Sequence, residues 1–441
     1  MILNDTIVAP ATPTGGAIAI VRIEGPDAFE VCSRFFFPVR GELATMEGYT
    51  ATYGIVRDGK RRIDDVVLTL FRAPHSYTGG NMVEIGCHGS AYIVGEIVRL
   101  AVEAGARVAG AGEFTKRAFL AGKIDLSQAE AVADIIAADS KVSLTMADTQ
   151  LRGGYSSSLA ELRGELLRLA SLLELELDFS EEDVEFADRN ELTKLLGDIE
   201  KEIRRLATSF STGNALKKGV AVAIVGAPNV GKSTLLNRIV GDERAMVSDI
   251  AGTTRDTIEE SVTIDGVKFR FIDTAGLHTT EDRLENMGIE RTHRALGEAQ
   301  VIVEMFDQMA EDFVTPSEGQ HLVRVLNKCD KEGTKVPEGW IGISAKYGLG
   351  IEELLAAIRA TVDTTDILRG ETVVSNSRHY DALIRSLAPL QRARFSLSDG
   401  LPTDLVAQDI REVLSTIGEI TGEVTSGDIL AEIFSKFCIG K

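Results

Sequence analysis

The chain has 441 residues, of which 44% are hydrophobic and 26% are charged; this is enough for two to four domains of ordinary globular composition. Its formal net charge of −20 argues against a broad basic surface that grips nucleic acid without a partner. The four cysteines form no CxxC pair and no zinc-binding spacing, so we expect a reducing, cytoplasmic compartment. No signal peptide and no apolar run of about 18 residues is visible, so no membrane association is expected.

The first segment, residues 1–119, is expected to form a compact α+β domain. Short apolar runs separated by glycine-rich turns predict strands at residues 16–23, 66–71 and 81–85. A helix is predicted across residues 94–100.

Helical periodicity begins at residues 120–215 and returns at residues 366–441. Apolar residues three and four positions apart lie on one face of a helix. The series are Leu159, Leu162, Leu166, Leu169 and Leu173, then Leu192, Leu195, Leu196, Ile199, Ile203 and Leu206, and later Leu405, Val406, Ile410, Val413, Leu414 and Ile417. We therefore expect one discontinuous helical domain with an α/β domain inserted in its middle.

The inserted segment, residues 216–365, alternates strands and helices as a doubly wound, mostly parallel sheet does. A buried-strand run at residues 220–225 leads into Gly226-Ala227-Pro228-Asn229-Val230-Gly231-Lys232-Ser233, which fits the GxxxxGK[ST] pattern of a P-loop. Its glycines let the backbone wrap around phosphates, whose charge the helix N-terminus favours. Lys232 is expected to reach the β- and γ-phosphates, and the Ser233 hydroxyl to bind Mg²⁺.

Three further motifs follow in the order that a GTPase requires. Gly252-Thr253-Thr254-Arg255-Asp256 supplies a threonine for Mg²⁺, predicted to be Thr254, and Asp273-Thr274-Ala275-Gly276 has the DxxG form. In Asn327-Lys328-Cys329-Asp330 the aspartate accepts two guanine N–H donors that adenine lacks, and Ser344-Ala345-Lys346 completes the base pocket. The order predicts a Ras-like domain that binds GTP and Mg²⁺.

The residue that orients the attacking water is not obvious from the motifs. Leu277 follows the DxxG glycine where Ras-like enzymes carry a glutamine, and an apolar side chain cannot polarise water. Four acids that follow are candidates, although each one also fits a solvated helix face: Glu281, Asp282, Glu285 and Glu290. Asn229 stands beside the phosphates, where its amide oxygen can bind a monovalent cation in place of an arginine finger. Arg255 is the alternative within the same chain.

Four blocks outside the nucleotide motifs carry a more specific resemblance. They are residues 4–13, 112–120, 123–131 and the terminal Phe437-Cys438-Ile439-Gly440-Lys441. With them the chain closely resembles, end to end, the MnmE (TrmE) family of tRNA-modification GTPases.

The resemblance implies an N-terminal domain that dimerises and binds 5-formyl-tetrahydrofolate as a one-carbon donor. It implies a GTPase activated by potassium-dependent pairing of two GTPase domains. It also implies a heterotetramer with a MnmG (GidA)-type partner, which carries FAD and contributes most of the contact with tRNA. Such a complex builds a (carboxymethyl)aminomethyl group on carbon 5 of the wobble uridine. The alternative is a GTPase switch or ribosome assembly factor without one-carbon chemistry.

The resemblance also assigns roles to individual residues. Glu285 matches the family's water-orienting acid, and Cys438 matches a near-terminal cysteine, although a half-buried thiol without a catalytic role fits equally. The potassium positions are Asn229, Ser248, Ile250 and Thr253, and the folate positions are Arg22, Glu84, Lys123 and Lys441. Motifs and resemblance together predict this GTP-binding set: Asn229, Val230, Gly231, Lys232, Ser233, Thr234, Ser248, Asp249, Ile250, Ala251, Gly252, Thr253, Thr254, Asp273, Thr274, Ala275, Gly276, Asn327, Lys328, Asp330, Ser344, Ala345 and Lys346.

Three places depart from the family pattern, one of them a glycine-rich run near Pro13 that is shorter and lacks an arginine. Thr78-Gly79-Gly80-Asn81 replaces the usual Thr-Gly-Glu-Asp, and Glu304-Met305-Phe306-Asp307 stands where an all-apolar strand is more usual.

Overall fold

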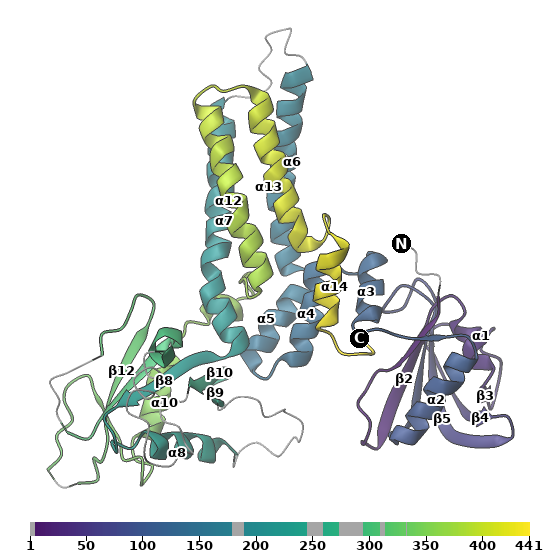
Figure 1. The fold of residues 1–441 in the computed structure, drawn as a ribbon, viewed down its shortest axis with the longest axis horizontal. Helices are drawn as coiled ribbons and strands as arrows, with labels where there is room; N and C mark the ends of the chain where they lie inside the picture. Colours follow the sequence, from purple (N-terminus) through teal and green to yellow (C-terminus); the bar gives the residue numbers. More distant parts are fainter. Residues whose placement is uncertain (1–4, 179–188, 245–258, 273–293, 309–313, 332) are drawn as a thin grey trace. The chain divides into compact units, whose positions relative to one another are not determined.

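The computed structural model describes residues 5–178, 189–244, 259–272, 294–308, 314–331 and 333–441 (Figure 1). Contacts divide the chain into two compact units: unit 1 comprises Met1–Ala133 and Ser415–Lys441, and unit 2 comprises Asp134–Leu414. Within the described ranges no helix is both long and apolar enough to cross a membrane. The domain boundaries expected near residues 119, 215 and 365 stay predictions, because this division follows contacts alone.

Unit 1 is built on a seven-stranded sheet with the order β3-β4-β5-β6-β2-β1-β7. Its strands are β1 (Ile7–Pro10), β2 (Ile18–Glu24), β3 (Phe36–Pro38), β4 (Thr50–Asp58), β5 (Arg61–Phe71), β6 (Met82–His88) and β7 (Arg107–Val108). Alternate residues of β5 from Val66 to Leu70 are buried in a core shared with α1 (Ala28–Ser33) and α2 (Ala91–Glu103). The three predicted strands and the predicted helix lie at β2, β5, β6 and α2, so these predictions are confirmed.

The end of the chain returns to unit 1. Helix α14 (Gly427–Ser435) packs against α3 (Glu113–Leu120) and α4 (Leu126–Ala137) through Leu126, Ile433 and Phe434. Beyond α14, Ile439 forms a β-bridge with Ala111, and the backbone N–H of Phe114 donates to the Lys441 carbonyl at 3.2 Å. The last residues are thus held by backbone contacts.

The helical part of unit 2 is drawn from both sides of the inserted segment. The long helices α6 (Gly154–Asp178), α7 (Arg189–Lys218), α12 (Ser377–Ser398) and the part of α13 (Thr403–Thr421) that precedes Ser415 lie side by side in Figure 1. Ion pairs join the two blocks, from Arg394 to Glu200 at 3.0 Å and from Arg411 to Glu174 at 2.7 Å. Shorter helices are α5 (Lys141–Leu151) and α11 (Thr365–Leu368). The expected discontinuous helical domain is confirmed.

The inserted segment forms a six-stranded sheet with the order β13-β12-β11-β8-β10-β9. Its strands are β8 (Val220–Gly226), β9 (Glu259–Ile264), β10 (Val267–Ile272), β11 (Val301–Phe306), β12 (His321–Leu326) and β13 (Ile341–Gly342), with helices α8 (Lys232–Arg244) and α10 (Ile351–Ala360). All neighbours pair in parallel except β9 and β10. Because β8 is central, the loop after it opens at the carboxyl edge, where such sheets bind ligands.

Candidate functional site

The loop between β8 and α8 has backbone angles that glycine and asparagine adopt more readily than other residues. Gly226 and Gly231 have φ angles of 150° and 110°, and Asn229 has a φ of 62°. A Cβ at Gly226 would lie 2.3 Å from the Met305 carbonyl oxygen, and one at Gly231 would lie 2.3 Å from Asn327 Nδ2. The loop therefore lies in close contact with Met305 and Asn327. Its N–H groups lie at the start of α8, where the end of a helix favours anions.

Lys232, the first residue of α8, folds over this loop. Its Nζ donates to the carbonyl oxygens of Gly226 at 2.8 Å and Ala227 at 2.9 Å. Burial lowers the pKa of Lys232, and a bound phosphate would oppose that effect by stabilising the ammonium charge. Ser233 follows in the first turn of α8 with a half-buried side chain, so its hydroxyl suits the oxygen coordination that Mg²⁺ prefers.

Asn327 connects three motifs that are far apart in the sequence. Its side chain is buried; Nδ2 donates to the Val230 carbonyl at 2.7 Å, and Oδ1 accepts the Ala345 N–H at 3.0 Å. One amide thereby links the phosphate-binding loop to the Ser344–Lys346 segment, which carries the predicted base pocket.

The acceptor predicted to select guanine is ionised and accessible. The Ser344 hydroxyl donates to Asp330 Oδ1 at 2.6 Å, and this hydrogen bond lowers the pKa of the Asp330 carboxyl. Asp330 is exposed, whereas Ser344 is buried beneath it. Lys346 is exposed beside it, with its ammonium 5.0 Å from the centre of the Tyr347 ring. The arrangement presents a carboxylate that can accept the two N–H donors of guanine.

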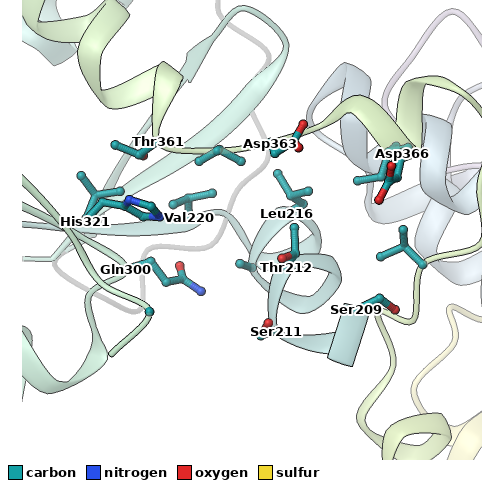
Figure 2. A pocket seen from close by; sticks show the side chains of 16 residues that line it. Ser209, Ser211, Thr212, Leu216, Val220, Gln300, His321, Thr361, Asp363 and Asp366 are labelled. Atoms are coloured by element: carbon teal, nitrogen blue, oxygen red, sulfur yellow. The ribbon is translucent and has the colours of Figure 1, made fainter. Parts of the chain in front are cut away.

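Two cavities lie at opposite edges of this sheet. One of about 470 Å³ adjoins the P-loop and is lined by Gly226, Ala227 and Val230 together with the end of β11. The other, of about 460 Å³, is lined by the first residues of β8, β11 and β12 and by residues of α7 and α11 (Figure 2). Every described nucleotide motif follows a carboxyl end of a strand, so the second cavity is remote from the nucleotide chemistry.

Several predicted site residues lie outside the described residues, and their roles stay predictions. They are Ser248, Asp249, Ile250, Ala251, Gly252, Thr253, Thr254 and Arg255, then Asp273, Thr274, Ala275, Gly276 and Leu277, and the acids Glu281, Asp282, Glu285 and Glu290. Among the described residues, no group of three or more His, Cys, Asp or Glu side chains is placed to hold a metal ion.

The candidate folate residues of unit 1 meet across its sheet. Arg22 on β2 is the register partner of Glu84 on β6, and its Nη2 lies 2.7 Å from Glu84 Oε1. Arg22 Nη1 also donates to the Gly440 carbonyl at 3.1 Å, and its guanidinium lies 5.4 Å from the centre of the Phe114 ring. Arg22, Glu84 and the residue before Lys441 therefore form one cluster.

The fourth candidate, Lys123, is joined to this cluster by residues 74–79. Lys123 Nζ donates to the Pro74 carbonyl at 3.1 Å, whereas the Tyr77 ring centre lies 5.8 Å from the Arg22 guanidinium carbon. All four predicted positions consequently border the same part of unit 1. Cys438 is exposed near it, and its carbonyl accepts the Gly112 N–H at 3.3 Å.

The glycine at position 80 has a local explanation. A Cβ there would lie 2.5 Å from Glu24 Oε1, so the Glu24 carboxylate fills the space of any side chain at this position. Thr78 donates to Glu24 Oε1 at 3.1 Å, and Arg117 donates to Glu24 Oε2 at 2.8 Å. Burial raises the pKa of Glu24, whereas Arg117 opposes the rise. The sequence alone assigned no role to Glu24 or Arg117, because their pairing is long-range.

Glu113 is a third charged residue to which the sequence alone assigned no role. Burial opposes its ionisation, but hydrogen bonds from Arg107, the Gly110 N–H and Arg117 outweigh burial and lower the pKa of Glu113 to about 2. Asp5 joins the same network through Arg107 and Arg117, each at 2.7 Å. These pairs fix the start of α3 beside β1.

Comparison with known proteins covers the whole chain. Residues 6–123 match the family model described as GTP-binding protein TrmE N-terminus, and residues 126–438 match the MnmE helical domain. The tRNA modification GTPase MnmE of Flavobacterium psychrophilum is 47% identical over 100% of both chains. The chain belongs to the MnmE family.

A second relative matches over its full length, whereas a solved structure matches only part of the chain. MnmE of Christiangramia forsetii, also named a tRNA modification GTPase, is 48% identical over 100% of both chains. The crystal structure of Aquifex aeolicus Era is 28% identical over 38% of this chain and 65% of that one, with a TM-score of 0.26, too low to add to the fold assignment.

Proposed function

We propose that this chain hydrolyses GTP to drive modification of the tRNA wobble uridine at carbon 5, in the cytoplasm. The single observation that supports it most is Asn327, which ties the phosphate-binding loop to the guanine-binding segment in a chain 47% identical, end to end, to a tRNA modification GTPase. The chain is a GTP-hydrolysing enzyme of the MnmE family. Its nucleotide chemistry follows from the P-loop and from the ionised Asp330.

Hydrolysis needs a positioned water and stabilisation of the charge that develops on the phosphates. In the proposed mechanism, Lys232 and the P-loop N–H groups hold the phosphates, while Ser233 and Thr254 hold Mg²⁺. Glu285 orients the water. Asn229, Ser248, Ile250 and Thr253 would hold potassium, which would supply positive charge in place of an arginine finger when two GTPase domains pair. Asn229 supports this proposal because its exposed amide stands on the left-handed turn of the phosphate loop.

The one-carbon donor in this proposal is 5-formyl-tetrahydrofolate, bound beside Arg22 and Glu84. Lys123, Lys441 and Arg22 offer positive charge to the carboxylates of its glutamate tail, and Glu84 accepts hydrogen bonds from its amino groups. Support comes from the contacts of Arg22 with Tyr77 and Gly440 and of Lys123 with Pro74, since these segments lie far apart in the sequence.

A homodimer through unit 1 is part of the proposal. Side chains alternate between the faces of a sheet, so Tyr53, Val67 and Ile18 share the face of Arg22 and Glu84, opposite the α2 core. These three apolar residues are 52%, 49% and 72% exposed. Apolar side chains exposed on one face favour a protein partner, here a second copy. A MnmG-type partner carrying FAD would complete a heterotetramer and bind most of the tRNA, as the net charge of −20 suggests.

The test is mass analysis of wobble nucleosides in tRNA from cells that lack this protein. We expect loss of the (carboxymethyl)aminomethyl group, and its return when the gene is restored. Unchanged nucleosides would contradict the proposal and favour a GTPase switch or ribosome assembly factor. A titration with 5-formyl-tetrahydrofolate separates these two functions in vitro, because an assembly factor has no reason to bind it saturably.

A further inference from the structure

An acidic residue, Asp307, follows β11 beside the predicted nucleotide site. In the sheet order, β11 lies between β8 and β12, so its carboxyl end stands between the P-loop and the Asn327–Asp330 segment. Asp307 is the first residue after β11, and its Oδ2 lies 2.5 Å from Lys328 Nζ. Lys328 Nζ also lies 3.3 Å from the carbonyl oxygen of Asn229.

The two backbones that this contact joins are both in uncommon conformations. Lys328 has a φ of 66° and Asn229 a φ of 62°, in the left-handed region that residues other than glycine rarely adopt. Such conformations persist where surrounding contacts hold them. The Asn327 side chain donates a hydrogen bond to the next carbonyl, that of Val230, at 2.7 Å. Asn327 and Lys328 therefore bind two consecutive carbonyl groups of the P-loop.

The position of the Lys328 ammonium at the P-loop depends on its ion pair with Asp307. A lysine side chain is flexible, and a single 3.3 Å hydrogen bond to a carbonyl fixes it weakly. The 2.5 Å contact with the Asp307 carboxylate is a charge-assisted bond, and it fixes the ammonium between β11 and the P-loop. The other acid of this strand, Glu304, has a separate task, because it accepts the Val314 N–H at 2.6 Å and pairs with Arg324.

We propose that Asp307 is a positioning residue for guanine nucleotide, which acts through Lys328 to hold the P-loop at Asn229. This inference rests on the proposed function, since it assigns a further residue to the same nucleotide site. It also explains why an acid directly follows a strand that is otherwise buried and largely apolar: the carboxylate couples the guanine-binding segment to the phosphate-binding loop.

A double-mutant cycle on the full-length chain tests the proposal. The measurement is the dissociation rate of a fluorescent N-methylanthraniloyl GDP from the wild type, Asp307→Asn, Lys328→Met and the double variant. We expect Asp307→Asn to speed release about threefold to tenfold in the wild-type background, and to have almost no effect where Lys328 is already methionine. Equal acceleration in both backgrounds, or none in either, would overturn the proposal.

Two controls separate this role from a general effect on folding or charge. Asp363→Asn removes the same charge from an exposed residue beside the cavity at the opposite edge of the sheet, and it should leave release unchanged. Asp307 and Lys328 have side chains about one-third exposed, at 32% and 34%, so the nucleotide-free Asp307→Asn chain should unfold within about 2 °C of the wild type. A much larger decrease would show a structural role and overturn the inference. A wild type that binds no GDP analogue would instead overturn the proposed function.

Discussion

The two candidate sites are built in opposite ways. In unit 2, the nucleotide residues stand on loops at the carboxyl ends of β8 and β12, and short motifs carry their geometry. In unit 1, Arg22 and Glu84 meet only through the register of two strands, and Gly440 reaches them from the end of the chain. The first kind of site is local in sequence, whereas the second depends on the whole unit being folded. Substitutions in the first site should therefore reduce nucleotide binding, whereas substitutions in the second should reduce the stability of unit 1.

The largest expected effect is at the P-loop. Gly231→Ala places a Cβ 2.3 Å from Asn327 Nδ2 at a φ of 110°, so it should weaken GDP binding by more than about 100-fold, because both the loop and the Asn327 link must shift. Calorimetric titration with GDP measures this effect. Gly241→Ala on α8 is the matched control, because its Cβ meets nothing within 4 Å. Normal GDP binding by Gly231→Ala would show that the loop does not need the close approach.

The second effect separates the two units. Gly80→Ala should destabilise unit 1 by about 1–3 kcal/mol, because its Cβ would lie 2.5 Å from the Glu24 carboxylate, which Arg117 and Thr78 hold in place. Denaturant unfolding measures the loss, and GDP affinity should stay the same. Gly95→Ala on α2 is the control, since open space surrounds its Cβ. Unchanged stability of Gly80→Ala would mean that Glu24 relaxes without cost.

The smallest effect is a pH dependence that belongs to unit 1. The pKa of Glu113 is lowered from 4.5 to about 2, so its ionised form stabilises the fold above pH 4.5, and this contribution is lost as the pH falls toward 2. The wild type should therefore be more stable than Glu113→Gln near pH 6, with the difference shrinking steadily below pH 4.5. Denaturant unfolding of both chains at several pH values measures it. A difference that does not change with pH would exclude an ionisation effect.

Sequence patterns predicted the helical domain and part of each sheet, because apolar positions mark α6, α7 and α13 and the strands β2, β5, β6 and β8. They also identified the P-loop and the Asn327–Asp330 segment, whose chemistry depends on near neighbours in the chain. They did not predict the ion pair of Glu24 with Arg117 or that of Asp307 with Lys328. Glu24 and Arg117 are 93 residues apart, whereas Asp307 and Lys328 follow two neighbouring strands, so only the folded sheets bring each pair together. A charged residue in isolation gives no sign of its partner. The sequence also did not show that position 80 has no room for a side chain, because the group that fills this space is the distant Glu24 carboxylate.

The final residues of the chain have a consequence for how unit 1 is made. Gly440 packs so closely on Pro10 that a Cβ would lie 2.0 Å from the Pro10 carbonyl oxygen, and Phe114 binds the Lys441 carbonyl. During synthesis from the amino end, β1 is complete long before these residues leave the ribosome, and all of unit 2 is made in the interval. The packing of β1 against Gly440 can therefore be completed only after the last residues of this sequence have been synthesised.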